Sequence, residues 1–490
     1  MPKIAVENLQ HFLEPKSIAV IGVSRQPGFS WGRGILENLV GAGFRGRVYP
    51  VNPRIEEIFG IKAYPDLASI PGEVELAVIA VPVGTVAAII EDCVRKEVKG
   101  VILVTAGYAE TSEGKELQAE LTKVAKRSGM RIVGPNVSGI FNVATNVNAS
   151  IVIHSYLRDT PITFISQGGY AIQDLIYRSY AKRMGIGKFI HTGNECDLTC
   201  TDFLEYVGAD PTVKVILMYI EGLREGRRFL EVAKRVSLEK PIIVLKAGRT
   251  EAGARAASSH TGAIAGSDLI FDAVLKQANV IRSPKMELIM DLGHAFLELP
   301  PLRGNRIGVV TMGGSWGVII TDALNRKGLD IPELSPGLRR KLRRLGMPYW
   351  ASTRNPVDLG AAGRSITVGG AAAVAEELVA SDEIDAVLAH GFGLGSLVGM
   401  EPNLSTAHQV EEKMLKRIYD LIPRYGKPIL VCSYFSEREN QAIDTITRQG
   451  YRVYHDVEDA ATILASLYEY YSRLNHLTSN CHPASHALPS

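Results

Sequence analysis

The sequence predicts an α/β protein that is divided into several domains with parallel, doubly wound sheets. Its 490 residues exceed what one compact core usually holds, so two to four domains are expected. Continuous apolar runs alternate with helical stretches, which is typical of parallel strands that helices cover on both faces. The 47 glycines and an aromatic content of only 7% suit the many tight turns that join strands to helices in such folds.

The first domain is predicted over residues 1–145. Its β-branched runs are separated by helical stretches, and each run is short enough for a single strand. Five strands are expected at residues 17–22, 47–52, 76–81, 100–105 and 131–134. This pattern indicates a Rossmann-like, doubly wound domain.

Two further domains are predicted over residues 146–300 and 301–473, with a loose tail over residues 474–490. Their strands are expected at residues 161–166, 213–219, 241–245, 306–311, 386–389 and 428–432. Both domains open with a strand, a Gly-Gly turn and a helix, as in Gln167-Gly168-Gly169 and Met312-Gly313-Gly314. Each therefore resembles a flavodoxin-like domain, although short matches of this kind also arise by chance.

The charge balance excludes two classes of protein. The 54 Lys and Arg residues nearly cancel the 52 Asp and Glu residues, which leaves a formal net charge of +2. A strongly basic nucleic-acid binder and an acidic solvating protein are therefore excluded. The first 13 residues lack a signal-peptide core, and no apolar run approaches the roughly 20 residues that span a bilayer. We expect a soluble, cytoplasmic protein with no membrane or nucleic-acid partner.

The cysteines indicate neither a disulfide framework nor a metal site. Of the five, only Cys196 and Cys200 lie close together, and no second His or Cys pair completes a zinc pattern. Reduced thiols of a cytoplasmic protein are the simplest interpretation, and no metal is expected.

A glycine-rich loop follows the first predicted strand, from Gly22 to Gly34. Glycines let the backbone approach an anion, and the N-terminus of the next helix favours negative charge. The loop does not fit the dinucleotide pattern G-x-G-x-x-G, because Ser24 occupies the second glycine position. Arg54 follows the second strand where a ribose-binding acid is expected, so an additional phosphate fits better. A tight turn without a ligand is the alternative interpretation.

The segment from Lys246 to Gly266 is rich in small residues and contains His260. A lone histidine is usually structural, but this one lies between Ser259 and Thr261 in a segment with little bulk. Imidazole is a competent nucleophile towards phosphoryl groups if one tautomer is held in place. Glu221, at the carboxyl end of a predicted strand, is a candidate for that positioning role.

The two Gly-Gly turns are candidate phosphate sites. Helix N-termini supply backbone N–H donors to phosphoryl oxygens without a mobile cation. The residues concerned are Gln167, Gly168 and Gly169 in one turn and Gly313, Gly314 and Ser315 in the other. Glycines that only permit close strand–helix packing are the alternative at each turn.

These motifs together resemble the α subunit of the ADP-forming (NDP-forming) acyl-CoA synthetases, of the succinyl-CoA synthetase superfamily. The resemblance extends from about Leu13 to about Tyr470 and is most specific from Glu251 to Gly262. Other matching segments are Ile21–Arg25, Ile79–Pro82, Val104–Glu110, Gly134–Asn136, Gly193–Asp197, Tyr219–Gly222 and Asn355–Asp358.

The resemblance implies a CoA-binding domain followed by two succinyl-CoA-ligase-like domains. It implies that His260 carries a phosphoryl group, that Glu221 orients this histidine and that the two Gly-Gly helix ends hold the phosphate. It also implies a set of CoA-lining positions, namely Gly22, Val23, Ser24, Arg25, Arg54, Val81, Pro82, Thr105, Ala106 and Asn136.

The implied activity is an acid–CoA ligase that reversibly couples an acyl-CoA thioester to ATP and ADP through an acyl phosphate and a phosphohistidine. No ATP-grasp segment is visible, so ATP or ADP with Mg²⁺ is expected on a separate ATP-grasp β subunit, in an α2β2 heterotetramer. A CoA-binding regulatory protein that has lost turnover is the alternative, and the missing dinucleotide motif disfavours a nicotinamide oxidoreductase.

Three segments depart from the family pattern. Gly168 replaces a serine, Ser138 replaces the leucine of Gly-Pro-Asn-Cys-Leu-Gly, and Ser315 with Trp316 replaces a Gly-Pro pair. Because these positions are expected near the thioester and the phosphate, they predict a changed acid substrate. We expect a small acid that is polar or anionic at its far end, with neutral drift as the alternative.

Overall fold

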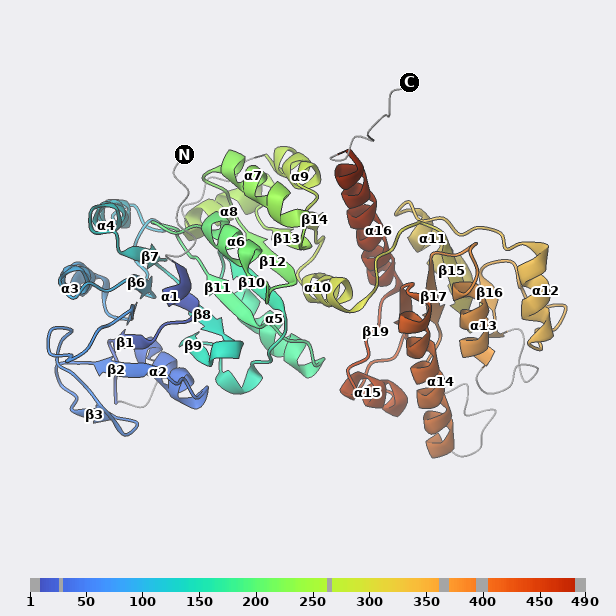
Figure 1. Ribbon diagram of the computed structural model, residues 1–490, viewed down its shortest axis with the longest axis horizontal. Helices are drawn as coiled ribbons and strands as arrows, with labels where there is room; N and C mark the ends of the chain where they lie inside the picture. Colours follow the sequence, from blue (N-terminus) through green and yellow to red (C-terminus); the bar gives the residue numbers. More distant parts are fainter. Residues whose placement is uncertain (1–8, 26–29, 262–266, 361–369, 394–403, 481–490) are drawn as a thin grey trace, which may run out of the picture. The chain divides into compact units, whose positions relative to one another are not determined.

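The computed structural model describes residues 9–25, 30–261, 267–360, 370–393 and 404–480. The chain divides into two compact units, Met1–Gly293 and His294–Ser490. Two large sheets form the frame of the first unit and one forms the frame of the second (Figure 1). The predicted α/β class with parallel sheets is confirmed.

The first sheet has five parallel strands in the order β2-β1-β5-β6-β7. The strands are β1 (Ser17–Ile21), β2 (Arg47–Val51), β5 (Leu76–Ile79), β6 (Gly100–Leu103) and β7 (Arg131–Val133). The helices of this part are α1 (Gln10–Leu13), α2 (Trp31–Gly41), α3 (Val83–Arg95) and α4 (Gly114–Ser128), and β3 (Glu57–Ile58) pairs with β4 (Ile61–Lys62). Every residue of β1, β5 and β6 is buried, as continuous apolar runs predict.

The second sheet has seven strands in the order β14-β13-β12-β10-β11-β8-β9. The parallel strands are β10 (Ile162–Ser166), β11 (Lys188–His191), β12 (Val215–Ile220), β13 (Ile242–Lys246) and β14 (Ile281–Arg282), and β8 (Gly139–Asn142) and β9 (Val147–Ser150) add an antiparallel edge. The helices are α5 (Tyr170–Ala181), α6 (Cys200–Ala209), α7 (Gly226–Ser237), α8 (Glu251–Thr261), α9 (Asp268–Gln277) and α10 (Leu288–Glu298), with short turns η2 (Val143–Thr145) and η3 (His154–Tyr156).

The second unit is built on five parallel strands in the order β16-β15-β17-β18-β19. The strands are β15 (Ile307–Thr311), β16 (Val357–Asp358), β17 (Ala386–His390), β18 (Ile429–Cys432) and β19 (Val453–Tyr454). The helices are α11 (Gly314–Asn325), α12 (Pro336–Arg344), α13 (Gly370–Val379), α14 (Leu404–Tyr425), α15 (Gln441–Arg448) and α16 (Val457–Asn480). Residues 474–480 continue α16, whereas the sequence predicts a loose tail there; residues 481–490 lie outside the described part.

All three sheets share one order when their parallel strands are numbered along the chain: 2-1-3-4-5. In this order the chain reverses direction across the sheet between strands 1 and 3, and ligands bind beyond the carboxyl ends of the strands at that point. The three switch points lie between β1 and β5, between β10 and β12, and between β15 and β17. The turns singled out in the sequence follow β1, β10 and β15.

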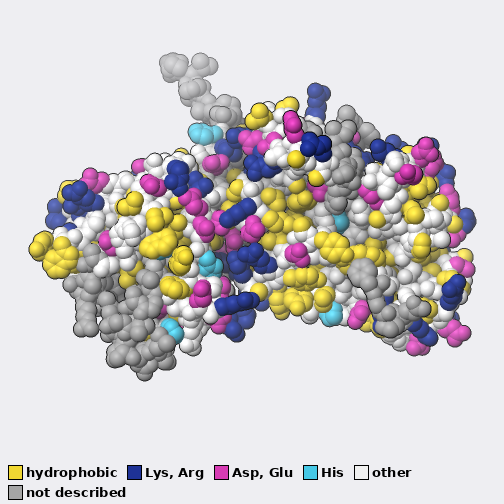
Figure 2. Space-filling view, turned by 180° about the vertical axis from the view of Figure 1, so that it is seen from behind, with side chains coloured by type: hydrophobic (Ala, Val, Ile, Leu, Met, Phe, Trp, Pro, Cys, Tyr) yellow, Lys and Arg dark blue, Asp and Glu magenta, His cyan; other side chains and the backbone are white. Residues whose placement is uncertain are grey.

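Charges are interspersed over the surface, in keeping with the small net charge. Figure 2 shows Lys and Arg side chains next to Asp and Glu side chains across the face drawn. None of the described helices combines the length and the apolar character that a membrane crossing requires.

Candidate functional site

One cavity of about 630 Å³ lies where the carboxyl ends of the first two sheets meet in the first unit. Helices α2 and α5 both begin at its wall, so two helix N-termini direct backbone N–H groups and positive potential towards it. Its lining residues come from both sheets: Ser24, Ser30, Trp31, Ala80, Val81, Pro82, Val104, Thr105, Ala106, Asn136, Val137, Ser138, Gln167, Gly168, Gly169, Tyr170, Ala171, His191, Tyr219 and Glu221.

The cavity brings together ten of the residues that the sequence predicts. These are Ser24, Val81, Pro82, Thr105, Ala106, Asn136, Gln167, Gly168, Gly169 and Glu221. Gly22, Val23, Arg25 and Arg54 are not among the residues that line it. The Arg25 guanidinium instead donates to the carbonyl oxygen of Glu57, with Nε 2.7 Å away.

The side chain of Gln167 fixes the turn after β10 to the end of β12. Its Oε1 accepts hydrogen bonds from the backbone N–H groups of Glu221 (2.7 Å) and Gly222 (3.1 Å). Its Nε2 donates to the carbonyl oxygen of Gly222 at 2.8 Å. Gln167 therefore sets the distance between the Gly168–Gly169 turn and Glu221.

Glu221 presents a buried carboxylate at the wall of the cavity, with 4% of its surface exposed. The Tyr219 hydroxyl donates to its Oε1 at 3.3 Å, and burial together with the neighbouring carboxylate raises the pKa of Tyr219. Lys246 Nζ donates to the Glu221 backbone carbonyl at 2.7 Å, and burial lowers the pKa of this lysine. A carboxylate held in this way can orient a cation or an imidazole.

Two rings enclose the Gly168–Gly169 turn. Ser166, the last residue of β10, pairs with His191 of β11 on one side and with Tyr219 of β12 on the other. A Cβ at Gly169 would lie 2.8 Å from His191 Cε1, and a Cβ at Gly168 would lie 2.8 Å from Tyr219 Cε1. Side chains are excluded from the turn because the rings occupy the space.

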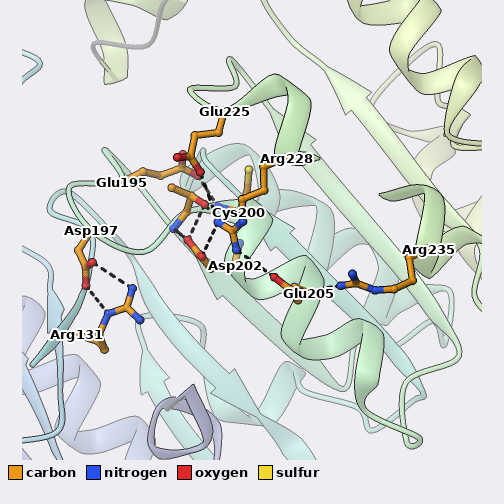
Figure 3. A network of polar contacts seen from close by, with 10 residues as sticks. Arg131, Glu195, Asp197, Cys200, Asp202, Glu205, Glu225, Arg228 and Arg235 are labelled. Carbon is orange, nitrogen blue, oxygen red and sulfur yellow. Dashed lines mark hydrogen bonds and ion pairs between the residues drawn. The ribbon is translucent and has the colours of Figure 1, made fainter. Parts of the chain in front are cut away.

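A polar network holds the loop that follows β11 (Figure 3). Arg131, at the start of β7, forms an ion pair with Asp197 at 2.9 Å. Glu195 is buried and accepts a hydrogen bond from the backbone N–H of Cys200 at 2.8 Å, and burial raises its pKa. Arg228 of α7 contacts Asp202 of α6 at 2.8 Å. The network joins the first sheet to the second through the segment Gly193–Asp197.

The first sheet contributes strand ends with few charges to the cavity. Thr105 Oγ1 donates to the carbonyl oxygen of Val81 at 2.7 Å, which ties two adjacent strand ends together. Asn136, at φ 63°, points its amide towards Asn194 at 3.5 Å. Glu110 accepts a hydrogen bond from Asn194 Nδ2 at 2.5 Å. Burial raises the pKa of Glu110, but hydrogen bonds from backbone N–H groups and Asn194 outweigh this and lower it.

The backbone of His260 belongs to α8, which begins at Glu251. Its side chain lies outside the described part, as do the residues 262–266 that follow the helix. Gly313, Gly314 and Ser315 lie in the second unit, where α11 begins at Gly314.

No group of three or more His, Cys, Asp and Glu side chains in the described part of the chain could hold a metal ion. The four described cysteines, Cys93, Cys196, Cys200 and Cys432, are buried free thiols.

Four aromatic side chains that line the cavity were not predicted as site residues: Trp31, Tyr170, His191 and Tyr219. The strand that ends at His191 was not anticipated, although Phe189-Ile190 between Gly187 and Gly193 carries a short apolar signal. Tyr219 was predicted as the last residue of a strand and as part of a matching segment, but not as a site residue. Both tyrosine and histidine become neighbours of the Gly-Gly turn through strand register, which composition does not reveal.

Comparison with known proteins assigns both sheets of the first unit. Residues 16–142 match the model of a CoA binding domain, and residues 159–296 match that of a succinyl-CoA ligase like flavodoxin domain. The chain is 37% identical over 463 residues to the acetate–CoA ligase [ADP-forming] II subunit alpha of Pyrococcus furiosus, covering 94% of this chain and 97% of the relative. The chain belongs to the α subunits of the ADP-forming acid–CoA ligases.

Further comparisons agree with this family. The acetate–CoA ligase [ADP-forming] I subunit alpha of Pyrococcus furiosus is 34% identical over 468 residues, covering 94% of this chain and 98% of the relative. A structure of the Ca. Korarchaeum cryptofilum dinucleotide forming acetyl-coenzyme A synthetase 1, in complex with phosphate and ADP, superposes with a TM-score of 0.84. It is 32% identical and covers 97% of this chain and 99% of that chain. The chain is therefore an acid–CoA ligase subunit that contains a CoA binding domain.

Proposed function

We propose that this α subunit makes and breaks an acyl-CoA thioester in the cavity of the first unit and that His260 carries the phosphoryl group. The observation that supports this best is the buried Glu221 carboxylate beside the Gly168–Gly169 turn. Strand ends of the CoA binding domain form the opposite wall of the same cavity. A thioester and a phosphoryl group would therefore meet in one enclosed space.

The proposed reaction has three steps. Phosphate attacks the carbonyl carbon of the acyl-CoA, which releases CoA as its thiol and forms an acyl phosphate. His260 then takes the phosphoryl group through a ring nitrogen, and the carboxylic acid leaves as its carboxylate. The phosphohistidine passes the phosphoryl group to ADP, which forms ATP and restores the histidine. All steps are reversible.

Each group has a defined role in this scheme. The turn Gln167–Gly168–Gly169 binds the phosphoryl group at the N-terminus of α5. The N–H groups of Gln167 and Gly168 already donate to the Tyr219 carbonyl oxygen and to Ser166 Oγ, so the phosphoryl oxygens are left to the N–H groups from Gly169 onwards. Glu221 orients the imidazole of His260. Gly313, Gly314 and Ser315 at the start of α11 are a second phosphate-binding turn. The first-sheet positions implied by the family, Gly22, Val23, Ser24, Arg25, Arg54, Val81, Pro82, Thr105, Ala106 and Asn136, bind CoA.

The β subunit is proposed to be an ATP-grasp protein that binds ATP or ADP with Mg²⁺ in an α2β2 heterotetramer. The subunit names of the relatives support a β partner. The three-domain division, with boundaries near residues 145, 300 and 473, and the cytoplasmic location remain predictions.

The phosphohistidine is tested with the complete complex and γ-labelled ATP in the absence of acid. Wild type is expected to form an acid-labile, base-stable phosphoprotein, and His260→Ala is expected to form none. Glu221→Gln should slow formation by about 10²-fold or more, the usual effect of removing a group that orients a catalytic histidine. Matched controls are His476→Ala and Glu231→Gln, which alter exposed side chains on α16 and α7.

Labelling of the His260→Ala variant would refute the assignment of the phosphohistidine. CoA binding without turnover of any acid by the complete complex would instead support the regulatory alternative.

A further inference from the structure

Ser138 and His191 form a buried pair in the cavity wall that the phosphoryl transfer steps do not use. His191 Nδ1 lies 2.7 Å from the backbone N of Ser138 and 2.8 Å from its Oγ. His191 Nε2 lies 3.1 Å from the carbonyl oxygen of Gln167. The residues are only 6% and 5% exposed, and both line the cavity.

The partners of His191 assign its tautomer. The Gln167 carbonyl oxygen can only accept a hydrogen bond, so Nε2 must carry the ring proton. Nδ1 then carries one lone pair, which the Ser138 backbone N–H (2.7 Å) and the Ser138 hydroxyl (2.8 Å) share as donors. The hydroxyl hydrogen is thus directed at His191. No other group in the described part of the chain hydrogen-bonds to Ser138 Oγ, so this oxygen offers the cavity an acceptor.

Strand register explains why this acceptor lies beside the proposed phosphate turn. Strand β8 runs antiparallel to β11, with Ile140 opposite Ile190, so Ser138, which immediately precedes β8, lies next to His191 at the end of β11. A Cβ at Gly169 would lie 3.5 Å from Ser138 Oγ. The oxygen is therefore within one side-chain length of the turn to which a carboxylate or acyl phosphate would bind.

The opposite side of the turn carries the negative charge of the cavity. The Glu221 carboxylate lies 3.6 Å from the position of a Cβ at Gly168. A second carboxylate on the acid would thus face Glu221 on one side and the lone pairs of Ser138 on the other, which disfavours dicarboxylic acids. A hydroxyl or N–H group would instead meet an acceptor.

We propose that Ser138 determines the specificity for the acid and that His191 is its positioning residue. The substrate class is a small monocarboxylic acid with a hydrogen-bond donor, such as a hydroxyl, close to its carboxyl group. This inference rests on the proposed function of the cavity as the acyl site. An acid without a donor displaces water from the buried Ser138 oxygen but forms no hydrogen bond with it. This unpaired acceptor lowers kcat/KM for that acid.

The experiment compares matched acids in the complete complex with CoA and ATP. The pairs are propionate with 2-hydroxypropionate and with 3-hydroxypropionate, and butyrate with 3-hydroxybutyrate; malonate and succinate test a second anion. ADP formation gives kcat/KM for each acid. In wild type, kcat/KM for at least one hydroxylated acid is expected to exceed that for the matching acid without the hydroxyl by about 10-fold or more. The dicarboxylic acids are expected to give low kcat/KM values.

Variants test whether Ser138 and His191 cause the preference for hydroxylated acids. Ser138→Ala should reduce the hydroxylated-to-plain ratio to within about twofold, and Ser138→Thr, which keeps the oxygen, should retain a preference. His191→Phe should reduce the ratio chiefly through a higher KM for the hydroxylated acid, since the oxygen remains but is no longer oriented. Ser69→Ala, the same substitution at an exposed turn, is the matched control and should leave the ratio unchanged.

Three outcomes overturn the proposal: no preference for any hydroxylated acid in wild type, a preference that survives in Ser138→Ala, or a preference for malonate or succinate. Labelling by ATP without acid distinguishes the causes. A phosphoprotein without the expected preference refutes only the specificity, whereas no phosphoprotein and no turnover refutes both the specificity and the proposed function.

Discussion

The two Gly-Gly turns begin in the same way but have different neighbours. Ser166 Oγ donates to the carbonyl oxygen of Gly168 at 2.5 Å, and Thr311 Oγ1 donates to that of Gly313 at 3.2 Å. Counted along the chain, β16 corresponds to β11 and β17 to β12. His390 of β17 therefore occupies the strand position that Tyr219 occupies in the first unit, since both pair with the last residue of the central strand.

The difference lies in how the flanking histidines are satisfied. Both ring nitrogens of His191 have hydrogen-bond partners. His390 is 3% exposed and stacks against Trp316 at 4.3 Å between ring centroids, and its Nδ1 has no hydrogen-bond partner among the described residues. A repeated backbone motif thus supports a polar, fixed wall in the first unit and an aromatic one in the second. The side chains that surround a Gly-Gly turn, and not the turn itself, therefore determine the chemical character of each site.

The largest effect expected from this difference is a pH dependence of the second unit. Burial lowers the pKa of His390 from 6.5 to about 4. The unfolded chain therefore binds a proton below pH 6.5 while the native state does not, so the unfolding free energy falls as pH decreases towards 4. The full loss is about 3 kcal/mol.

His390→Phe is expected to remove most of this pH dependence. Hydrogen exchange of peptides from β15 and β17, corrected for intrinsic rates, measures it between about pH 7 and about pH 4.5. His476→Phe, at an exposed position of α16, should keep the wild-type slope. An unchanged slope in His390→Phe would show that other groups cause the effect.

An intermediate effect is expected from alanine substitutions in the two turns. Gly169→Ala places a Cβ 2.8 Å from His191 Cε1, and such overpacking costs about 1–3 kcal/mol. Gly313 has an extended backbone at φ 171°, and nothing lies within 4 Å of a Cβ there, so Gly313→Ala should change stability by less than about 0.5 kcal/mol. Urea unfolding measures both, and equal losses would contradict the contrast between the turns.

The smallest effect is expected at the residues that begin the turns. Ser166 Oγ donates to the Gly168 carbonyl oxygen and accepts from the Gly168 N–H at 3.2 Å. Among the described residues, Thr311 Oγ1 makes only the first kind of bond, to the Gly313 carbonyl oxygen. Ser166→Ala should therefore cost about 1–2 kcal/mol and Thr311→Val about 0.5–1 kcal/mol. The same unfolding assay ranks the pair, and a larger loss for Thr311→Val would reverse the interpretation.

The strand ends were predictable from the sequence because apolar runs and glycine turns mark them directly. Glu221 and the Gly168–Gly169 turn were predicted as candidates on this basis, and the structure places both at one cavity. The Ser138–His191 pair was not predictable as a pair, since it depends on the antiparallel register of β8 and β11. For Ser138, the sequence showed only that it departs from the family pattern.

Arg25 shows why charge alone misleads. The sequence favours an anion as its partner, but the guanidinium donates to the carbonyl oxygen of Glu57. Glu57 begins the β3–β4 hairpin, which contains only two residues in each strand. Pairings this short leave almost no periodicity in the sequence, so the position of the hairpin could not be predicted.

The contacts between the two sheets of the first unit also constrain how this enzyme can be recombined. Arg131 holds Asp197 across the sheets, and Gln118 and Glu110 both hold Asn194. A chimera could join the CoA binding domain of one relative to the ligase-like domain of another. Such a chimera would lose these side-chain pairs and leave buried polar groups without hydrogen-bond partners. Substrate specificity is therefore expected to be exchanged between relatives only when the interacting residues of both sheets are transferred together.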